Sequence, residues 1–289
     1  MKKVLGIIFG IILVALAIAV IVAVNLGLFD TMGKVVKQML GNGDNVTMDT
    51  SEMDSMDGDS QSFAAGDVQQ LKLNCQYGTF NVEKGDGEDI QIVVKNNSDN
   101  VKYSLKEGVL TIATDSKISI GDADEVEMTL YVPNIVLFTT ADIDIGAGVL
   151  NFSDIMLSKM NINVGAGQIN MNNVSASDVI YELGAGEANN SNTDFSSLDL
   201  NVGAGAFNYD GYIAHDMNLN CSVGKIQMNL EGAYEDYNTD VTCNVGSVTV
   251  GPNIYSGKID NKTVDNDSLY DIYIKCDVGS VEVNFTKQS

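Results

Sequence analysis

Four stretches of the chain repeat one pattern: DIDIGAGVLNF at 142–152, NINVGAGQINM at 161–171, IYELGAGEANN at 180–190 and DLNVGAGAFNY at 199–209. Each is centred on Gly-Ala-Gly and begins 19 residues after the one before. Alternate positions on both sides of the glycines are apolar, with Asn190 as the exception. This alternation predicts strands with one buried face. The buried parity changes across the glycines, which predicts a bend there, and glycine tolerates the backbone that a bend requires.

The second glycine of the pattern continues as a column through the rest of the chain. Its members are Gly148, Gly167, Gly186, Gly205 and Gly224 at intervals of 19, then Gly246 after 22 residues and Gly279 after 33. One such unit cannot bury its own apolar face, so the units must stack on one another. The sequence therefore predicts an all-β fold, a single-chain parallel β-solenoid (β-helix) with ~19-residue rungs over residues 63–289.

The region upstream of the regular repeats follows the same columns more loosely. Gly78 and Gly108 are flanked by apolar residues at similar offsets, although Glu107 interrupts the second case. We expect both to mark further rungs, which gives about nine or ten rungs in all at ~4.8 Å each. An antiparallel sandwich is the rival architecture, but it predicts no fixed 19-residue period.

The N-terminus carries a different signal. Lys2 and Lys3 precede a run without charge from Val4 to Phe29, long enough at ~1.5 Å per residue to span a bilayer. We expect residues 1–29 to be one transmembrane helix that acts as a signal-anchor, with a cleaved signal peptide as the alternative. Residues 30–62 are expected to be a juxtamembrane segment and an acidic linker. We expect a single-pass protein of the cell membrane whose bulk is extracytoplasmic.

Composition excludes several classes of function. The net charge is −23, Arg is absent and there is one His, so no basic surface is available for nucleic acid. The same scarcity argues against an enzyme. The Gly-Ala-Gly turns lack the spacing of a cofactor loop and no C-x-x-C is present, so we expect neither cofactor nor metal.

The four cysteines all fall in one apolar column, three residues before a turn glycine: Cys75, Cys221, Cys243 and Cys276. We expect small buried side chains at these positions. A disulfide between Cys221 and Cys243 is the alternative, because their rungs would be neighbours if coils stacked in chain order.

Two longer intervals insert extra chain at 231–240 and 251–270. Insertions in a solenoid are often its binding loops. These carry four tyrosines that either contact a partner or hold their own loops to the rod: Tyr234, Tyr237, Tyr255 and Tyr270.

Taken together, the strand Asp142–Ile145, the Gly-Ala-Gly turns and the segment Leu130–Pro133 resemble a bacterial family. It is the "putative adhesin" family of β-strand-repeat domains of unknown function. The resemblance implies a membrane-anchored domain of the cell envelope, and some relatives are linked to envelope stress. It supplies no catalytic residues.

These observations favour a non-enzymatic binding or adhesin-like module, or an envelope-stress module, outside the cell. Without Lys2 and Lys3 the chain carries 39 acidic residues and 14 lysines, so partners are expected to be an envelope protein or a cationic peptide. One alternative is a bactofilin-like scaffold that binds copies of itself, since the final strand Val281–Phe285 would be an uncapped edge. A polysaccharide-active β-helix enzyme is the weaker alternative.

Overall fold

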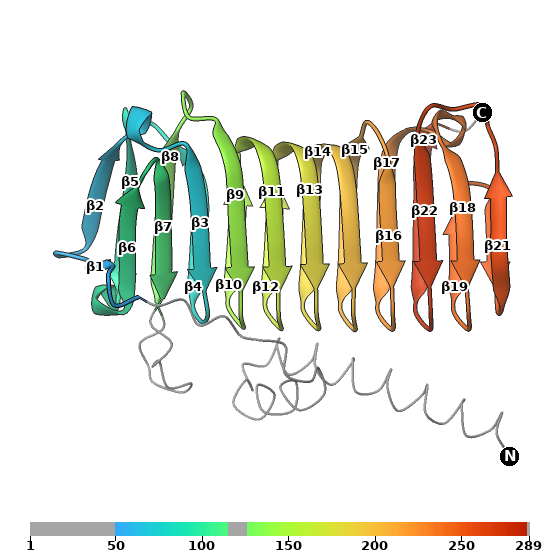
Figure 1. Ribbon diagram of the computed structural model, residues 1–289, viewed down its shortest axis with the longest axis horizontal. Helices are drawn as coiled ribbons and strands as arrows, with labels where there is room; N and C mark the ends of the chain where they lie inside the picture. Colours follow the sequence, from blue (N-terminus) through green and yellow to red (C-terminus); the bar gives the residue numbers. More distant parts are fainter. Residues whose placement is uncertain (1–49, 115–125, 288–289) are drawn as a thin grey trace, which may run out of the picture.

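The computed structural model describes residues 50–114 and 126–287. This part of the chain forms 23 strands and three short 3-10 turns, arranged as a rod of two facing sheets (Figure 1). The expected anchor at 1–29, and the expected linker as far as residue 49, lie outside the described residues. Within the described ranges, no helix has the length and apolar character needed to cross a membrane.

Each regular coil contributes one strand to each sheet. In order along the rod, the front sheet of Figure 1 contains β1 (Asp54–Ser55), β6 (Val101–Lys106), β7 (Val109–Thr114), β3 (Gln70–Cys75), β9 (Phe138–Ile145), β11 (Met156–Val164), β13 (Ser175–Leu183), the second half of β14 (Glu187–Val202), β16 (Met217–Cys221), β22 (Asp271–Cys276), β18 (Asn238–Cys243) and β21 (Ile259–Val264). The back sheet contains β2 (Ser60–Ala64), β5 (Asp89–Asn96), β8 (Glu127–Pro133), β4 (Thr79–Gly85), β10 (Val149–Ser153), β12 (Gln168–Asn172), the first half of β14, β15 (Ala206–Ile213), β17 (Lys225–Ala233), β23 (Ser280–Lys287), β19 (Ser247–Val250) and β20 (Asn253–Ser256).

The predicted all-β solenoid is confirmed in the central coils. Leu150 pairs with Ile169 and Ile162 pairs with Tyr181, so parallel partners are 19 residues apart. The alternating apolar side chains point between the sheets and form one continuous core. Asn190, the exception in the pattern, is buried with them at 3% exposure.

The turn glycines are required for a reason that the sequence did not suggest. At Gly167, Gly186 and Gly205 the backbone is not left-handed, so backbone freedom alone does not explain glycine there. A Cβ added at these positions would lie 2.2–2.4 Å from the carbonyl oxygen of the turn glycine on the adjacent coil. The corners approach so closely that only glycine fits between successive coils.

At the opposite corner, where each coil passes from the back sheet to the next front strand, the turn residues are Asp and Asn. Asp154, Asn173 and Asn192 adopt left-handed backbone with φ of 58°, 56° and 52°, a conformation that Asn and Asp tolerate better than other non-glycine residues. Their side chains stack: Asn173 Nδ2 donates to Asp154 Oδ1 at 2.6 Å, and Asn192 Nδ2 donates to Asn173 Oδ1 at 3.2 Å.

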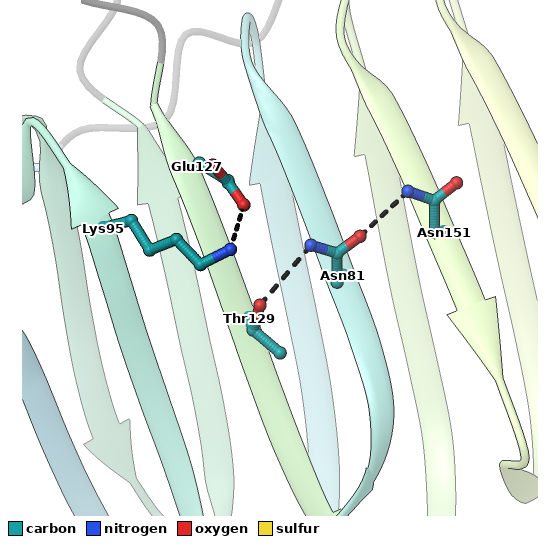
Figure 2. Close-up of polar contacts among 5 residues, drawn as sticks. All are labelled: Asn81, Lys95, Glu127, Thr129 and Asn151. Carbon is teal, nitrogen blue, oxygen red and sulfur yellow. Dashed lines mark hydrogen bonds and ion pairs between the residues drawn. The ribbon is translucent and has the colours of Figure 1, made fainter.

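A ladder of asparagines runs along the outer face of the back sheet. Asn81 Nδ2 donates to Thr129 Oγ1 at 3.4 Å, and Asn151 Nδ2 donates to Asn81 Oδ1 at 2.8 Å (Figure 2). The same contact repeats through Asn170, Asn189 and Asn208 at 2.8–3.2 Å. Because each amide both donates and accepts, the ladder ties adjacent coils together along the rod.

The coils do not stack in chain order at the ends of the rod. At the C-terminal end, β22 and β23 lie between the coil of β16 and β17 and the coil of β18 and β19 (Figure 1). Stacking in chain order, on which the Cys221–Cys243 disulfide alternative depends, is therefore wrong at this end, since Gly279 lies between Gly224 and Gly246. The expectation that Val281–Phe285 is an exposed edge is wrong as well, because β23 has a partner on each side.

At the N-terminal end the chain order is also broken, but here later strands lie outside earlier ones. β3 and β4 contact the regular coil of β9 and β10, and the later strands β7 and β8 lie outside them. Gly108 does not mark a rung as expected, because Glu107 and Gly108 form the two-residue turn of an antiparallel hairpin, with φ of 51° and 79°. At this end β1 also pairs antiparallel with β6, β2 with β5, and β5 with β8. At the other end β20 pairs antiparallel with β19, and β21 with β18.

The folded strands begin upstream of the boundary expected at residue 63. β1 starts at Asp54, and both Met56 and Phe63 pack into the core, at 6% and 9% exposure. These two apolar side chains bring part of the acidic segment onto the end of the rod.

The cysteine column follows the spatial order of the coils. Cys276 pairs in register with both Cys221 and Cys243, so the disulfide considered between Cys221 and Cys243 would have to pass an intervening coil. All four cysteines are free and buried, as the apolar column predicted.

The glycine corner gives a direct test. We expect Gly186→Ala to lower the free energy of unfolding by about 1–3 kcal/mol, because its Cβ would lie 2.2 Å from Gly167 O. Thermal or chemical denaturation of the full-length protein measures the change. Gly66→Ala is the control, because no atom lies within 4 Å of the added Cβ; it should change stability by less than about 0.5 kcal/mol. Equal losses in the two variants would contradict the close-approach explanation.

Candidate functional site: an acidic groove on the front sheet

The outer faces of the two sheets carry different side chains. The middle of the back sheet presents the neutral asparagine ladder, with Glu83, Glu187 and Asp210 on neighbouring positions. On the front sheet, the outward positions of the strands from β3 to β18 along the rod form an acidic face, defined by Asp142, Asp144, Asp178, Glu182, Asp199 and Asp240, with Lys72, Lys159 and Lys275 as its basic residues. None of the three ion pairs found in the described ranges involves a carboxylate of this face.

The acidic face is hollowed over strands β3, β9, β11 and β13. This acidic groove has a volume of about 360 Å³. Its polar lining consists of Lys72, Asn74, Asp142, Asp144, Asn161, Asn163 and Glu182, and Ile180 adds an exposed apolar side chain. The lining residues come from four adjacent coils, because outward positions of successive strands lie side by side in a parallel sheet.

Amide groups orient the carboxylates of the acidic groove. Asn161 Nδ2 donates to Asp142 Oδ1 at 2.6 Å, and Asn163 Nδ2 donates to Asp144 Oδ1 at 3.3 Å. A neutral amide satisfies an oxygen without cancelling its charge. The groove therefore presents fixed negative charge to a ligand.

Burial has an effect on one of these carboxylates. Desolvation raises the pKa of Asp144, which is about half buried in the groove. The charged form of Asp144 is thus less favourable in the folded protein than in the unfolded chain. A cation bound beside Asp144 would relieve this cost.

The apolar columns of the repeat give no indication of the acidic groove. The signal was present in the residues between them. Asp142 and Asn161 share one outward column, and Asp144, Asn163 and Glu182 share the next, both with the period of 19.

The four tyrosines of the inserted segments gather at the C-terminal end of the rod. Tyr234 and Tyr237 are buried at 8% and 3% exposure, and both rings pack against Phe285, with centroids 5.8 and 6.0 Å away. The Tyr237 hydroxyl donates to Ile213 O, and Asn253 Nδ2 donates to Tyr234 Oη at 2.8 Å. These two rings hold the end module together.

The other two tyrosines are half-buried. Tyr255 lies on β20, and Tyr270 packs on the ring of His215 with centroids 4.8 Å apart. Binding of a partner by these loops stays a prediction. The seven turn glycines all lie in the stacked corners and none of them lines the acidic groove.

A second hollow lies toward the start of the same front strands. This edge groove has a volume of about 390 Å³ and exposes Leu137, Met156 and Tyr212, at 57%, 64% and 44%. Ser158, Ser175 and Asp194 supply part of its polar lining. Strands β11 and β13 contribute to both grooves.

Within residues 50–114 and 126–287, no group of three or more His, Cys, Asp or Glu side chains has an arrangement that could hold a metal ion. The carboxylates of the acidic groove are distributed along the rod and do not converge on one point.

Residues 68–267, more than two thirds of the chain, match the family model described as Toastrack DUF4097. The chain belongs to this family. This match confirms the resemblance expected from the Gly-Ala-Gly turns, to a family of β-strand-repeat domains of unknown function. Solved structures similar to the Toastrack chain are described as "putative adhesin" or "putative cell adhesion protein". A search of the curated proteins finds no match.

Three of those solved structures show how distant the similarity is. A "putative adhesin" from Bacteroides fragilis is 12% identical, with a TM-score of 0.42, over 78% of this chain and 95% of that one. A "putative cell adhesion protein" from Clostridium sporogenes is 12% identical, with a TM-score of 0.35, over 78% and 98%. A "putative adhesin" from Parabacteroides merdae is 14% identical, with a TM-score of 0.34, over 81% and 99%.

The raised pKa of Asp144 predicts a pH-dependent effect on the Toastrack domain. Above this pKa the ionised carboxylate opposes folding, and the penalty disappears as the pH falls and the group is protonated. We therefore expect Asp144→Asn to raise the Tm at pH 7 and to match the wild type at acidic pH. Thermal scans across pH measure this difference, with the exposed Asp178→Asn as control. A variant that is less stable than the wild type at pH 7 would contradict the prediction.

Proposed function

We propose that this Toastrack chain is a non-enzymatic, adhesin-like binding module of the bacterial cell envelope. Residues 1–29 hold it in the cell membrane, and the solenoid lies outside the cell. The acidic face of the front sheet is the binding surface, with the acidic groove at its centre, and the partner is cationic: a peptide or a basic segment of an envelope protein. A role in envelope stress belongs to the same proposal.

The observation that supports this proposal is the unneutralised charge of the acidic groove. Asp142 and Asp144 lie on β9, Glu182 lies on β13 two coils further along the rod, and Lys72 is the one basic residue in the lining. Amides hold the two aspartates in place. A rigid surface of this kind attracts basic side chains without needing to reorganise, and the attraction weakens as salt is added.

The apolar N-terminal run supports the proposed membrane anchor, and the net charge supports a cationic partner. The apolar run at Val4–Phe29 is long enough to anchor the chain, and residues 30–289 carry 39 acidic residues against 14 lysines. A rod with this charge is repelled by anionic surfaces and polymers, so it reaches cationic partners selectively.

The two alternative functions have less support. For a self-assembling scaffold, the rod would need open ends, but antiparallel strands cap both ends and the outermost front strand β21 carries Asp260 and Lys262. For a polysaccharide-active enzyme, the acidic groove offers carboxylates with one lysine, in a chain that has no Arg.

Binding to a synthetic lysine peptide tests the proposed surface. The full-length protein in detergent should bind the peptide at low salt and release it as salt rises. The triple variant Asp142→Asn, Asp144→Asn, Glu182→Gln should weaken binding by about tenfold, because it removes three charges at the site. Titration calorimetry or fluorescence anisotropy gives the two Kd values.

A matched control separates the site from the overall charge. Glu83→Gln, Glu187→Gln, Asp210→Asn removes three charges from the back sheet instead. We expect this variant to bind the lysine peptide nearly as well as the wild type. Equal weakening by both triple variants would show that net charge alone attracts the peptide, and the proposed surface would be wrong.

The proposed location has its own test. Protease added to intact cells should remove the C-terminal domain, as detected by blotting against it. A cytoplasmic protein should remain intact in the same sample, which shows that the cells were closed. Protection of the domain in intact cells, with digestion after lysis, would place the acidic rod inside the cell.

A further inference from the structure

One coil of the solenoid has a more polar interior than its neighbours. This polar coil, residues 175–193, buries Tyr181, Asn190 and Thr193 at 0%, 3% and 0% exposure. Three side-chain atoms there have no hydrogen-bond partner within the protein: Tyr181 Oη, Asn190 Oδ1 and Thr193 Oγ1. Burial of a polar atom without a partner is costly, so three in one coil need a common explanation.

The three residues are each adjacent to one of two stacked aromatic rings on the next coil, Phe207 and Tyr209. The Tyr181 ring meets Phe207 edge-on, with centroids 5.2 Å apart, and Phe207 stacks on Tyr209 at 6.3 Å. Asn190 pairs in register with Tyr209, whose hydroxyl donates to Thr193 O at 2.8 Å. Tyr181, from the front sheet, thus packs on Phe207, and Asn190 and Thr193 lie beside Tyr209, the ring that stacks on Phe207.

The polar coil also fills its interior with smaller side chains. Ala188 occupies a column where the neighbouring coils place Ile169 and Phe207. Asn190 itself replaces Met171 of the preceding coil. Tyr181 extends into part of the space that these residues leave, since it stands in a column of Ile and Leu.

We propose that the polar coil encloses one buried water molecule bound by these three side chains. Tyr181 Oη donates a hydrogen bond to the water oxygen, and the water donates its two hydrogens to Asn190 Oδ1 and Thr193 Oγ1. Three hydrogen bonds are typical of a buried water. The other hydrogen bonds of the coil are kept, because Asn190 Nδ2 still donates to Asn208 O at 2.9 Å.

A crystal structure of the full-length protein tests the site directly. We expect a density peak within hydrogen-bond distance of Tyr181 Oη, Asn190 Oδ1 and Thr193 Oγ1. Well-ordered side chains with no peak between them would overturn the proposal.

A mutant cycle provides an independent test. Tyr181→Phe should lower the Tm of the full-length protein by about 2–4 °C, because the water loses its donor. In the background of Asn190→Met, which copies Met171, the same change should no longer lower the Tm, because the water site is already lost. If Tyr181→Phe raises the Tm in the wild-type background, the hydroxyl is an unpartnered group with no water bound, and the proposal is wrong.

Discussion

Close contact between the glycine corners of successive coils is the constraint on which the rest of the rod depends. The corner carbonyls lie so near the next coil that a Cβ at Gly186 would be 2.2 Å from an oxygen. Because the corners stack without an offset, every strand that follows them starts in the same register. That register aligns the apolar columns of the core and places identical side chains above one another, as in the ladder from Asn151 to Asn208.

Antiparallel strands cover the parallel coils at both ends of the rod. A regular parallel coil leaves an open edge that can pair with other chains. Here the first coil, β3 with β4, and the last, β22 with β23, lie inside the rod, and other strands of the same chain cover them. The outermost strands pair antiparallel and do not continue the parallel stack. Two tyrosines of the first inserted loop stabilise the C-terminal end, because Tyr234 and Tyr237 pack on Phe285 from β23.

The difference between the two outer faces follows from the same register. Residues at one outward position of successive coils form a column along the rod, and these columns differ between the two sheets. The back sheet presents amides that satisfy one another, whereas Asp142, Asp144 and Glu182 give the front sheet unneutralised charge. Both grooves lie on the front sheet, and the proposed binding function rests on that face.

The all-β class, the 19-residue coil, the buried columns and the position of the corners can all be predicted from the sequence, because they depend on local alternation and a fixed period. The sequence also indicated the burial of Cys75, Cys221, Cys243 and Cys276. The order of the coils at the ends depends on tertiary packing, since the apolar columns of β18 and β22 fit the regular stack equally well. The acidic groove also depends on tertiary packing. Its lining comes from segments far apart along the chain, and stacking of β3 beside β9 brings Lys72 and Asn74 next to Asp142 and Asp144.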